Sequence, residues 1–361
     1  MTPLARIISD EIEKAGPISV SRFMELALGH PRYGYYMNRD PLGAKGDFIT
    51  APEVSQMMGE IIGLWAVVVW QAMGTPNPFV LAELGPGRGT LMADALRAGA
   101  IKAGFVEAAR VHLVETSPLL RARQADVLGI FEPTFLDTAM DLPPGPMIVI
   151  ANEFFDALPV RQLVATKDGW VERCVNSLPG TDGGFTFTTS APLETPLVPP
   201  NLPKSGAAGT VIEVSPESCR IAAALASRLA QAPGAALIID YGHAETAAGD
   251  TLQAVRGHKF ADPLANPGEA DLTAHVDFAA LARAARARGA EIHGPVSQGR
   301  FLIALGIAQR AERLKAGATP ALRDAIEAAL KRLIAPSEMG NLFKVMGLSQ
   351  AGGPALPGFA P

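Results

Sequence analysis

Apolar positions along the chain recur with two periods, one helical and one extended. In residues 2–16 and 19–28, apolar side chains return every third or fourth position, which predicts two amphipathic helices. Mostly apolar runs predict buried strands at residues 79–84, 147–151 and 236–242, and a further strand that ends in an acid is predicted at 111–117. Because helical spacing resumes between these runs, the pattern predicts an α/β fold with a mostly parallel sheet.

The remaining segments give weaker signals. A further helix is predicted from residue 52, and a weak strand at 133–137. The predicted buried face of that helix consists of Ile61, Ile62, Trp65, Val68 and Val69. Residues 160–205 combine short extended pieces with many prolines, which favours a β-hairpin insertion followed by a loop. Residues 251–268 are predicted to form a loop.

This pattern predicts two parts. Residues 1–78 are expected to form an N-terminal helical region with a loop that faces the cofactor or the substrate. Residues 79–361 are expected to form the main domain, with an insertion at about 160–210 and helices and strands at the C-terminal end.

A glycine-rich turn follows the run 79–84, in the sequence Glu83-Leu84-Gly85-Pro86-Gly87-Arg88-Gly89-Thr90. A dinucleotide site requires Gly-x-Gly-x-x-Gly, and Thr90 stands where its third glycine would be, which disfavours a nicotinamide-dependent oxidoreductase. The order acidic-x-Gly-x-Gly-x-Gly resembles class I methyltransferases that use S-adenosylmethionine. A glycine turn that only links a strand to a helix is the alternative interpretation.

The class I resemblance implies cofactor contacts at the carboxyl ends of the strands. Glu83 would lie near the amino and sulfonium charges of the cofactor, and Glu115 would accept hydrogen bonds from the ribose hydroxyls. Asp137 would approach the adenine amino group. A surface carboxylate is the alternative for Glu115. The other expected cofactor contacts are Gly85, Pro86, Gly87, Gly89, Ser117, Asn152, Thr50 and Pro52.

Charge and composition exclude several classes of function. The net charge is −5 and no block of Lys and Arg provides a stripe for phosphates, so we expect no nucleic-acid partner. Two distant cysteines and six scattered histidines form no ligand cluster, so we expect no metal. The apolar run 61–70 is broken at 74–78 and is too short to span a membrane. No targeting segment is evident at Met1.

Several longer motifs resemble a narrower group, the MidA family. They are Arg32-Tyr33-Gly34-Tyr35-Tyr36, the run 46–59, the glycine turn, the run Asn152-Glu153-Phe154-Phe155-Asp156-Ala157-Leu158-Pro159, and the runs 272–278 and 339–346. Together they cover nearly the whole chain. The departures from the usual pattern, Ile49 and Met58, do not alter the chemistry.

The MidA resemblance implies a fold, a cofactor and a substrate. The expected fold is the Rossmann-like sheet of class I methyltransferases with helices on both faces, and the expected cofactor is S-adenosyl-L-methionine. The expected activity is protein-arginine methylation, by symmetric dimethylation of the 49-kDa core subunit of respiratory complex I, which assists assembly of the complex. A bacterial, cytoplasmic member is expected, or a matrix protein if the chain is a processed eukaryotic one.

Three carboxylates are candidates for catalysis. A guanidinium is a poor nucleophile, so carboxylates that hold its planar fork and accept its proton would assist methyl transfer. Glu153 and Asp156 follow a predicted strand directly, and Asp47 lies in the glycine-rich run 46–59. Capping of a helix N-terminus is the alternative for Glu153 and Asp156. A non-enzymatic assembly chaperone that retains a cofactor pocket is the alternative for the whole chain.

Overall fold

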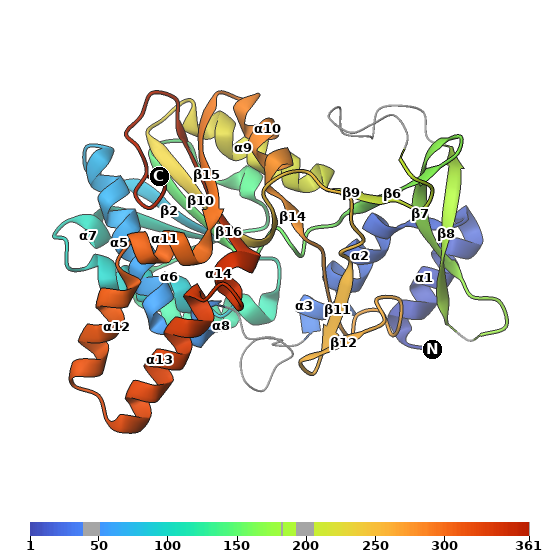
Figure 1. Cartoon of the computed structure of the whole chain (residues 1–361), viewed down its shortest axis with the longest axis horizontal. Helices are drawn as coiled ribbons and strands as arrows, with labels where there is room; N and C mark the ends of the chain where they lie inside the picture. Colours follow the sequence, from blue (N-terminus) through green and yellow to red (C-terminus); the bar gives the residue numbers. More distant parts are fainter. Residues whose placement is uncertain (39–50, 182, 193–205, 361) are drawn as a thin grey trace. The chain divides into compact units, whose positions relative to one another are not determined.

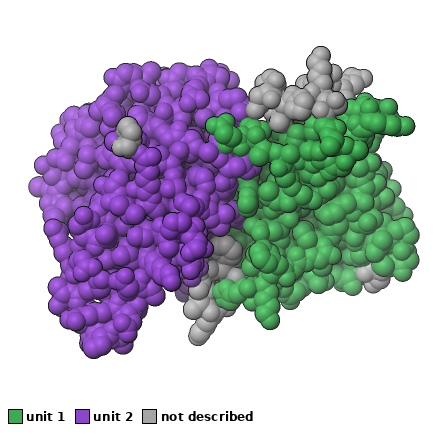
Figure 2. Space-filling model, viewed as in Figure 1, with its two compact units in different colours: residues 1–48, 156–218, 245–277 green, residues 49–155, 219–244, 278–361 purple. Residues whose placement is uncertain are grey.

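A computed structural model describes residues 1–38, 51–181, 183–192 and 206–360 (Figure 1). The chain forms two compact units, and each combines segments that are distant in sequence (Figure 2). Unit 1 consists of residues 1–48, 156–218 and 245–277, and unit 2 of residues 49–155, 219–244 and 278–361. This grouping differs from the sequence-based division at residue 78. Unit 1 is made of three segments that are separated in sequence by segments of unit 2.

Unit 2 contributes seven strands, in the order β15-β16-β10-β5-β2-β3-β4, to an eight-stranded sheet. The strands are β2 (Phe79–Leu84), β3 (Ala109–Val114), β4 (Thr134–Leu136), β5 (Met147–Asn152), β10 (Gly234–His243), β15 (Ala290–Ser297) and β16 (Phe343–Gln350). The five from β10 to β4 are parallel, and β16 is antiparallel to both β10 and β15. The predicted strands around the glycine turn are therefore confirmed.

Helices connect these strands. They are α4 (Ala51–Val54), α5 (Gln56–Ala72), α6 (Thr90–Gly99), α7 (Phe105–Ala108), α8 (Pro118–Leu128), α9 (Pro216–Leu229), α10 (Phe278–Arg286), α11 (Gln298–Ala304), α12 (Ile307–Ala316), α13 (Pro320–Ile334) and α14 (Met339–Leu342), with short 3-10 turns η1 (Gly129–Phe131) and η2 (Ala139–Asp141). Helix α5 packs against β5 and β10, while α10 packs against β10 and β15.

The central strands are buried on both faces. In β5 and β10 the alternating side chains Ile148 and Val149, and Leu237 and Ile238, are all almost fully inaccessible to solvent. Successive side chains of a strand point to opposite faces, so both faces of the sheet are covered. This explains why these strands are unbroken apolar runs in the sequence.

Unit 1 is built from helices and antiparallel strands. Its helices are α1 (Pro3–Ala15), α2 (Val20–Gly29) and α3 (Tyr35–Asn38). Its strands are β1 (Ile18–Ser19), β6 (Arg161–Thr166), β7 (Gly169–Ser177), β8 (Phe185–Pro192), β9 (Val211–Val214), β11 (Gln253–Arg256), β12 (Lys259–Ala261), β13 (Asp271–Thr273) and β14 (Val276–Asp277). The predicted hairpin is confirmed by the antiparallel pair β7 and β8.

Three local predictions require correction. The helix expected from residue 52 is divided into α4 and α5 at Ser55, whose hydroxyl accepts a hydrogen bond from Met57 N and so caps α5. Val68 is 48% exposed rather than buried, because it lies on the outer side of α5. Residues 251–268 contain β11 and β12 in addition to loop, since the two short strands pair with each other. The pattern also failed to indicate β15 and α12.

Candidate functional site

The glycine turn joins β2 to α6. Gly85, Gly87 and Gly89 have φ of 62°, 54° and 82°, a region that favours glycine. The amide of Gly85 donates to Val114 O at 3.0 Å, which holds the turn beside the end of β3. A Cβ atom added at Gly85 would lie 2.9 Å from the ring of Phe154. The turn, which includes Pro86, thus requires glycine both for its positive φ and for its close approach to the Phe154 ring where β2 ends.

Glu83 is the buried acid that precedes the turn. Its side chain is on β2, and the residue is 3% exposed. Burial raises its pKa to about 8, although a hydrogen bond with the backbone of Met92 acts in the opposite direction. Among the described residues, no group donates a hydrogen bond to its Oε2. A buried carboxyl oxygen without a donor suits a ligand that carries positive charge and N–H groups.

Glu115 directly follows β3 and is 8% exposed. Its Oε1 accepts a hydrogen bond from Ser117 N at 2.8 Å, and its Oε2 accepts one from Gln124 Nε2 at 3.2 Å. Burial raises its pKa, and these hydrogen bonds oppose that shift. The Ser117 hydroxyl caps α8 by accepting from Leu120 N. The surface-carboxylate alternative for Glu115 is therefore wrong.

Asp137 follows β4 and its side chain is 80% exposed. It forms an ion pair with Arg121 at 2.7 Å, so its position depends on α8. Pro52 is buried in α4, and the next residue, Glu53, accepts a hydrogen bond from Thr90 Oγ1 at 2.6 Å. Helix α4 is thereby attached to the first residue of α6. The predicted contacts Asp47 and Thr50 lie outside the described residues.

Asn152 ends β5, and Glu153 follows it with φ of 51°. A non-glycine residue in this region is uncommon and is often found at functional sites. The Glu153 Oε1 atom accepts hydrogen bonds from Ala51 N at 2.7 Å and from Asn152 Nδ2 at 3.2 Å. Asp240 is fully buried, and its Oδ2 accepts from Phe154 N and Phe155 N. The loop that carries Glu153 is thus fixed by β10.

Asp156 is 5% exposed and belongs to unit 1, whereas Glu153 belongs to unit 2. The backbone carbonyl of Asp156 accepts a hydrogen bond from Ala274 N at 3.0 Å. Burial raises the pKa of Tyr36 well above its usual range, and the charges of Asp271 and Asp156 add to this effect. Residues 153–160 form bends and a turn without a helix, so the capping alternative for Glu153 and Asp156 is wrong.

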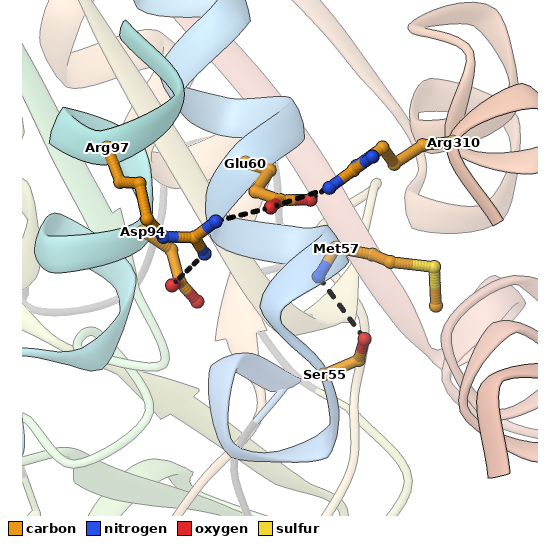
Figure 3. A network of polar contacts seen from close by, with 6 residues as sticks. All are labelled: Ser55, Met57, Glu60, Asp94, Arg97 and Arg310. Carbon is orange, nitrogen blue, oxygen red and sulfur yellow. Dashed lines mark hydrogen bonds and ion pairs between the residues drawn. The ribbon is translucent and has the colours of Figure 1, made fainter. Parts of the chain in front are cut away.

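A network of charged side chains surrounds the buried carboxylate of Glu60 (Figure 3). The Glu60 carboxylate on α5 accepts hydrogen bonds from Arg97 of α6 at 2.8 Å and from Arg310 of α12 at 2.6 and 3.0 Å. Arg97 also pairs with Asp94. Burial raises the pKa of Glu60, but the hydrogen bonds from Arg310 and Arg97 outweigh it and leave this pKa below its ordinary value.

The sequence did not single out Gln124, Arg121 and Glu53, which hold the candidate site residues in place. Gln124 had a detectable signal. It lies midway between Leu120 and Leu128, at the spacing of one helix face, and all three are buried. A polar residue at an apolar position of a helix indicates a buried hydrogen bond.

In the part of the chain that the structure describes, no three His, Cys, Asp or Glu side chains gather in a way that could hold a metal ion. Within the same ranges no helix is both long and apolar enough to cross a membrane.

Comparison with known proteins gives the family. The family model described as "Putative S-adenosyl-L-methionine-dependent methyltransferase" matches residues 61–296. The chain belongs to this methyltransferase family. The methyltransferase is 38% identical to the Drosophila melanogaster protein named protein arginine methyltransferase NDUFAF7 homolog, mitochondrial, over 96% of this chain and 84% of that protein. It is 36% identical to human protein arginine methyltransferase NDUFAF7, over 96% of this chain and 83% of that protein.

Solved structures support the same relationship. A Burkholderia thailandensis protein bound to S-adenosyl-homocysteine has a TM-score of 0.84 and 31% identity, over 99% of this chain and 94% of that chain. A second structure from this organism has a TM-score of 0.82 and 32% identity. The methyltransferase fold and the S-adenosyl-L-methionine cofactor are therefore confirmed. The glycine turn and the buried oxygen of Glu83 fit such a cofactor.

Proposed function

We propose that this methyltransferase modifies an arginine of a protein, namely the 49-kDa-type subunit of respiratory complex I, by symmetric dimethylation that supports assembly of the complex. The observation that carries the proposal is near full-length similarity, at 36–38% identity, to relatives named protein arginine methyltransferases. The proposed location is the bacterial cytoplasm, or the mitochondrial matrix for a processed eukaryotic chain, since these relatives are named mitochondrial.

The proposed cofactor site uses the edge where β2 and β3 end. S-adenosylmethionine supplies an electrophilic methyl group on a sulfonium. Glu83 would face the positive charge of the cofactor, because its buried oxygen lacks a donor among the described residues. Glu115 would accept the ribose hydroxyls, and Asp137 would approach the adenine. The glycine turn would give close backbone contact, with Ser117, Asn152, Pro52 and Thr50 around it.

Glu153 is the proposed catalytic acid–base residue. Its carboxylate would hold the substrate guanidinium by charge-assisted hydrogen bonds and accept the proton released as the methyl group arrives. The two hydrogen bonds to Oε1 and the buried anchor at Asp240 fix its direction, so little reorganisation is needed. Asp156 and Asp47 remain proposed partners in holding the guanidinium.

Transfer of labelled methyl groups tests this proposal. The full chain is incubated with labelled S-adenosylmethionine and the purified 49-kDa-type subunit, and the modified residue is found by mass spectrometry. We expect methyl units on an arginine. We expect Glu153→Gln to reduce kcat by about a hundredfold or more, equivalent to about 2.7 kcal/mol in the transition state, because the amide keeps the shape but neither carries charge nor accepts a proton.

Glu132→Gln is the matched control. Glu132 is exposed and also has positive φ, at 49°, so it reproduces the substitution and the backbone region outside the site. It should leave kcat unchanged, and both variants should bind S-adenosyl-homocysteine as the wild type does. Full activity of Glu153→Gln would remove Glu153 from the mechanism. Cofactor binding together with subunit binding, but without methyl transfer, would favour the chaperone alternative.

A further inference from the structure

Helix α8 contacts three residues assigned to the cofactor, namely Gly87, Glu115 and Asp137, and Gln124 makes two of these contacts. Its Nε2 donates to Gly87 O in the glycine turn at 2.6 Å and to Glu115 Oε2 at 3.2 Å. Gln124 is fully buried. One amide therefore links the turn after β2 to the residue after β3. Gln124 and Gly87 are 37 residues apart in sequence.

The orientation of the Gln124 amide follows from its neighbours. Both atoms facing Nε2 are oxygens without hydrogen, a backbone carbonyl and a carboxylate. An amide turned the other way would place its own oxygen against both acceptors, which is unfavourable. The two N–H groups of the side chain are thus both used, one for each strand end.

Arg121 makes the matching contacts one turn earlier in α8. Its Nε donates to the backbone carbonyl of Glu115 at 2.6 Å, and its Nη2 pairs with Asp137 at 2.7 Å. Arg121 also lies over the ring of Phe135 in β4, 5.7 Å from its centroid. The main chain of Glu115 is held by Arg121, while its side chain is held by Gln124 and Ser117.

The Glu115 carboxylate keeps accepting capacity after these bonds form. Each carboxylate oxygen has two lone-pair sites. Ser117 N occupies one site on Oε1, Gln124 occupies one on Oε2, and the backbone amide of Thr116 also hydrogen-bonds to the carboxylate. Of about four lone-pair sites at least one therefore stays open, and the fixed carboxylate can still accept a hydroxyl of a vicinal diol such as that of a ribose.

We propose that Gln124 is a positioning residue for the cofactor: its amide sets the spacing between the glycine turn and the ribose-binding carboxylate of Glu115. This role depends on the proposed function of Glu115 but not on the proposed protein substrate. Loss of the amide leaves the Glu115 carboxylate without its donor on Oε2, while Ser117 N still holds Oε1, and leaves the Gly87 carbonyl without its buried donor. Ligands that use the diol should lose more affinity than ligands that lack it.

Calorimetric titration of the full chain with S-adenosyl-homocysteine tests this role. Gln124→Met keeps the length and apolar shape of the side chain but removes both N–H groups. We expect its dissociation constant to rise at least tenfold. Gln298→Met is the matched control, since Gln298 is also fully buried and donates from Nε2 to a backbone carbonyl, Leu333 O at 2.9 Å, but contacts neither strand end. Its dissociation constant should stay within about twofold of wild type.

An analogue of S-adenosyl-homocysteine without the ribose 2′ and 3′ hydroxyls separates positioning from general damage. The ratio of dissociation constants between Gln124→Met and wild type should fall to about threefold or less for this analogue. When Glu115→Gln is already present, adding Gln124→Met should raise the dissociation constant for S-adenosyl-homocysteine by a much smaller factor than Gln124→Met does alone. Gln124→Asn, which keeps the amide but cannot reach both acceptors, should resemble Gln124→Met and serves if the latter does not fold.

Three outcomes would overturn the proposal. They are unchanged affinity in both Gln124 variants, an equal loss for the ligand and its dideoxy analogue, and an equal loss in Gln298→Met. The proposed substrate fails separately: wild-type chain that binds S-adenosyl-homocysteine but never methylates the complex I subunit contradicts the proposed function and leaves the Gln124 result intact.

Discussion

Unit 2 buries two glutamates in opposite ways. Glu60 in the helical layer accepts hydrogen bonds from Arg97 and Arg310, and its pKa lies below the ordinary value (Figure 3). Glu83 at the end of β2 is equally buried, but its pKa is raised to about 8 and, among the described residues, its Oε2 has no donor. The charge of Glu60 is balanced by two arginines of the same chain. Glu83 instead has an oxygen that could bind a cationic ligand.

The comparison separates structural from functional acids. Removing one partner of a buried ion pair leaves an uncompensated charge, so Glu60 should govern stability. A buried carboxyl whose pKa is raised to about 8, and which has one oxygen without a donor among the described residues, is typical of a binding site. Glu83 should therefore govern ligand binding and its pH dependence. Substitutions of Glu60 and Glu83 test this division, and Gly63→Ala tests the packing of the helix that carries Glu60; they follow from the largest expected effect on the chain to the smallest.

Glu60→Gln should have the largest effect. It removes the charge-assisted hydrogen bonds of two partly exposed arginines to a buried carboxylate, and we expect the free energy of unfolding to fall by about 2 to 3 kcal/mol, measured by urea denaturation at neutral pH. Because the folded pKa is lowered, the stability from Glu60 is present above the ordinary pKa of 4.5 and is lost as pH falls through the folded value. The difference between wild type and variant should therefore shrink in acid.

Glu327→Gln is the control for Glu60. Glu327 pairs with Lys315 at 2.7 Å, but its side chain is 63% exposed. A surface pair of this kind contributes little, so the denaturation midpoint should not move. Equal destabilisation by the two substitutions would show that burial of Glu60 is not what makes it structural.

Gly63→Ala should have the next largest effect. A Cβ at this position of α5 would lie 2.5 Å from the Cα of Ala95 in α6, too close for any side chain. We expect a loss of about 2 kcal/mol from overpacking, measured by thermal and urea unfolding. Gly129→Ala is the control, because its added Cβ would have no atom within 4 Å. A stable Gly63→Ala chain would mean that α5 and α6 can separate without cost.

Glu83→Gln should change the proton release that accompanies cofactor binding more than it changes the stability of the chain. With a raised pKa, the stability that the folded state gains from protonated Glu83 is full below 4.5 and is lost as pH rises toward 8. Binding of the cationic cofactor near neutral pH should ionise Glu83 and release a proton, detected by titration calorimetry in buffers of different ionisation enthalpy. Glu83→Gln should abolish this release, whereas substitution of the exposed Glu107 should not. Persistent release in Glu83→Gln would assign the proton to another group.

Much of the cofactor edge could be predicted because it depends on local patterns. The run 79–84, the glycine turn and the acid at 115 follow one another along the chain, and parallel strands bring their carboxyl ends to one edge. The structure adds burial and hydrogen bonds to Glu83 and Glu115. It also shows that the acids after β5 begin no helix, which the local pattern left open.

The supporting contacts could not be predicted, for a physical reason. Gln124 reaches Gly87 and Glu115 because of the rotation of α8 about its axis, and Arg310 reaches Glu60 across 250 residues. The helix period indicates that Gln124 is buried, but neither the acceptors of Gln124 nor the partner of Arg310 follows from a sequence period. Strand β15 was missed because its side chains are mostly half-exposed and a register shift interrupts its pairing with β16. Short exposed strands such as β12, which has three residues, are too brief to give a periodic signal.

The position of β16 has a consequence for synthesis on the ribosome. Residues 343–350 lie between β10 and β15, both of which are made earlier. Until they emerge, each of those two strands has an unpaired edge, the kind of surface that promotes aggregation and that chaperones recognise. Every residue assigned to the cofactor has by then been translated. We therefore expect nascent chains that stop short of β16 to be degraded, so that methyl-donor binding is limited to chains whose translation has passed residue 350.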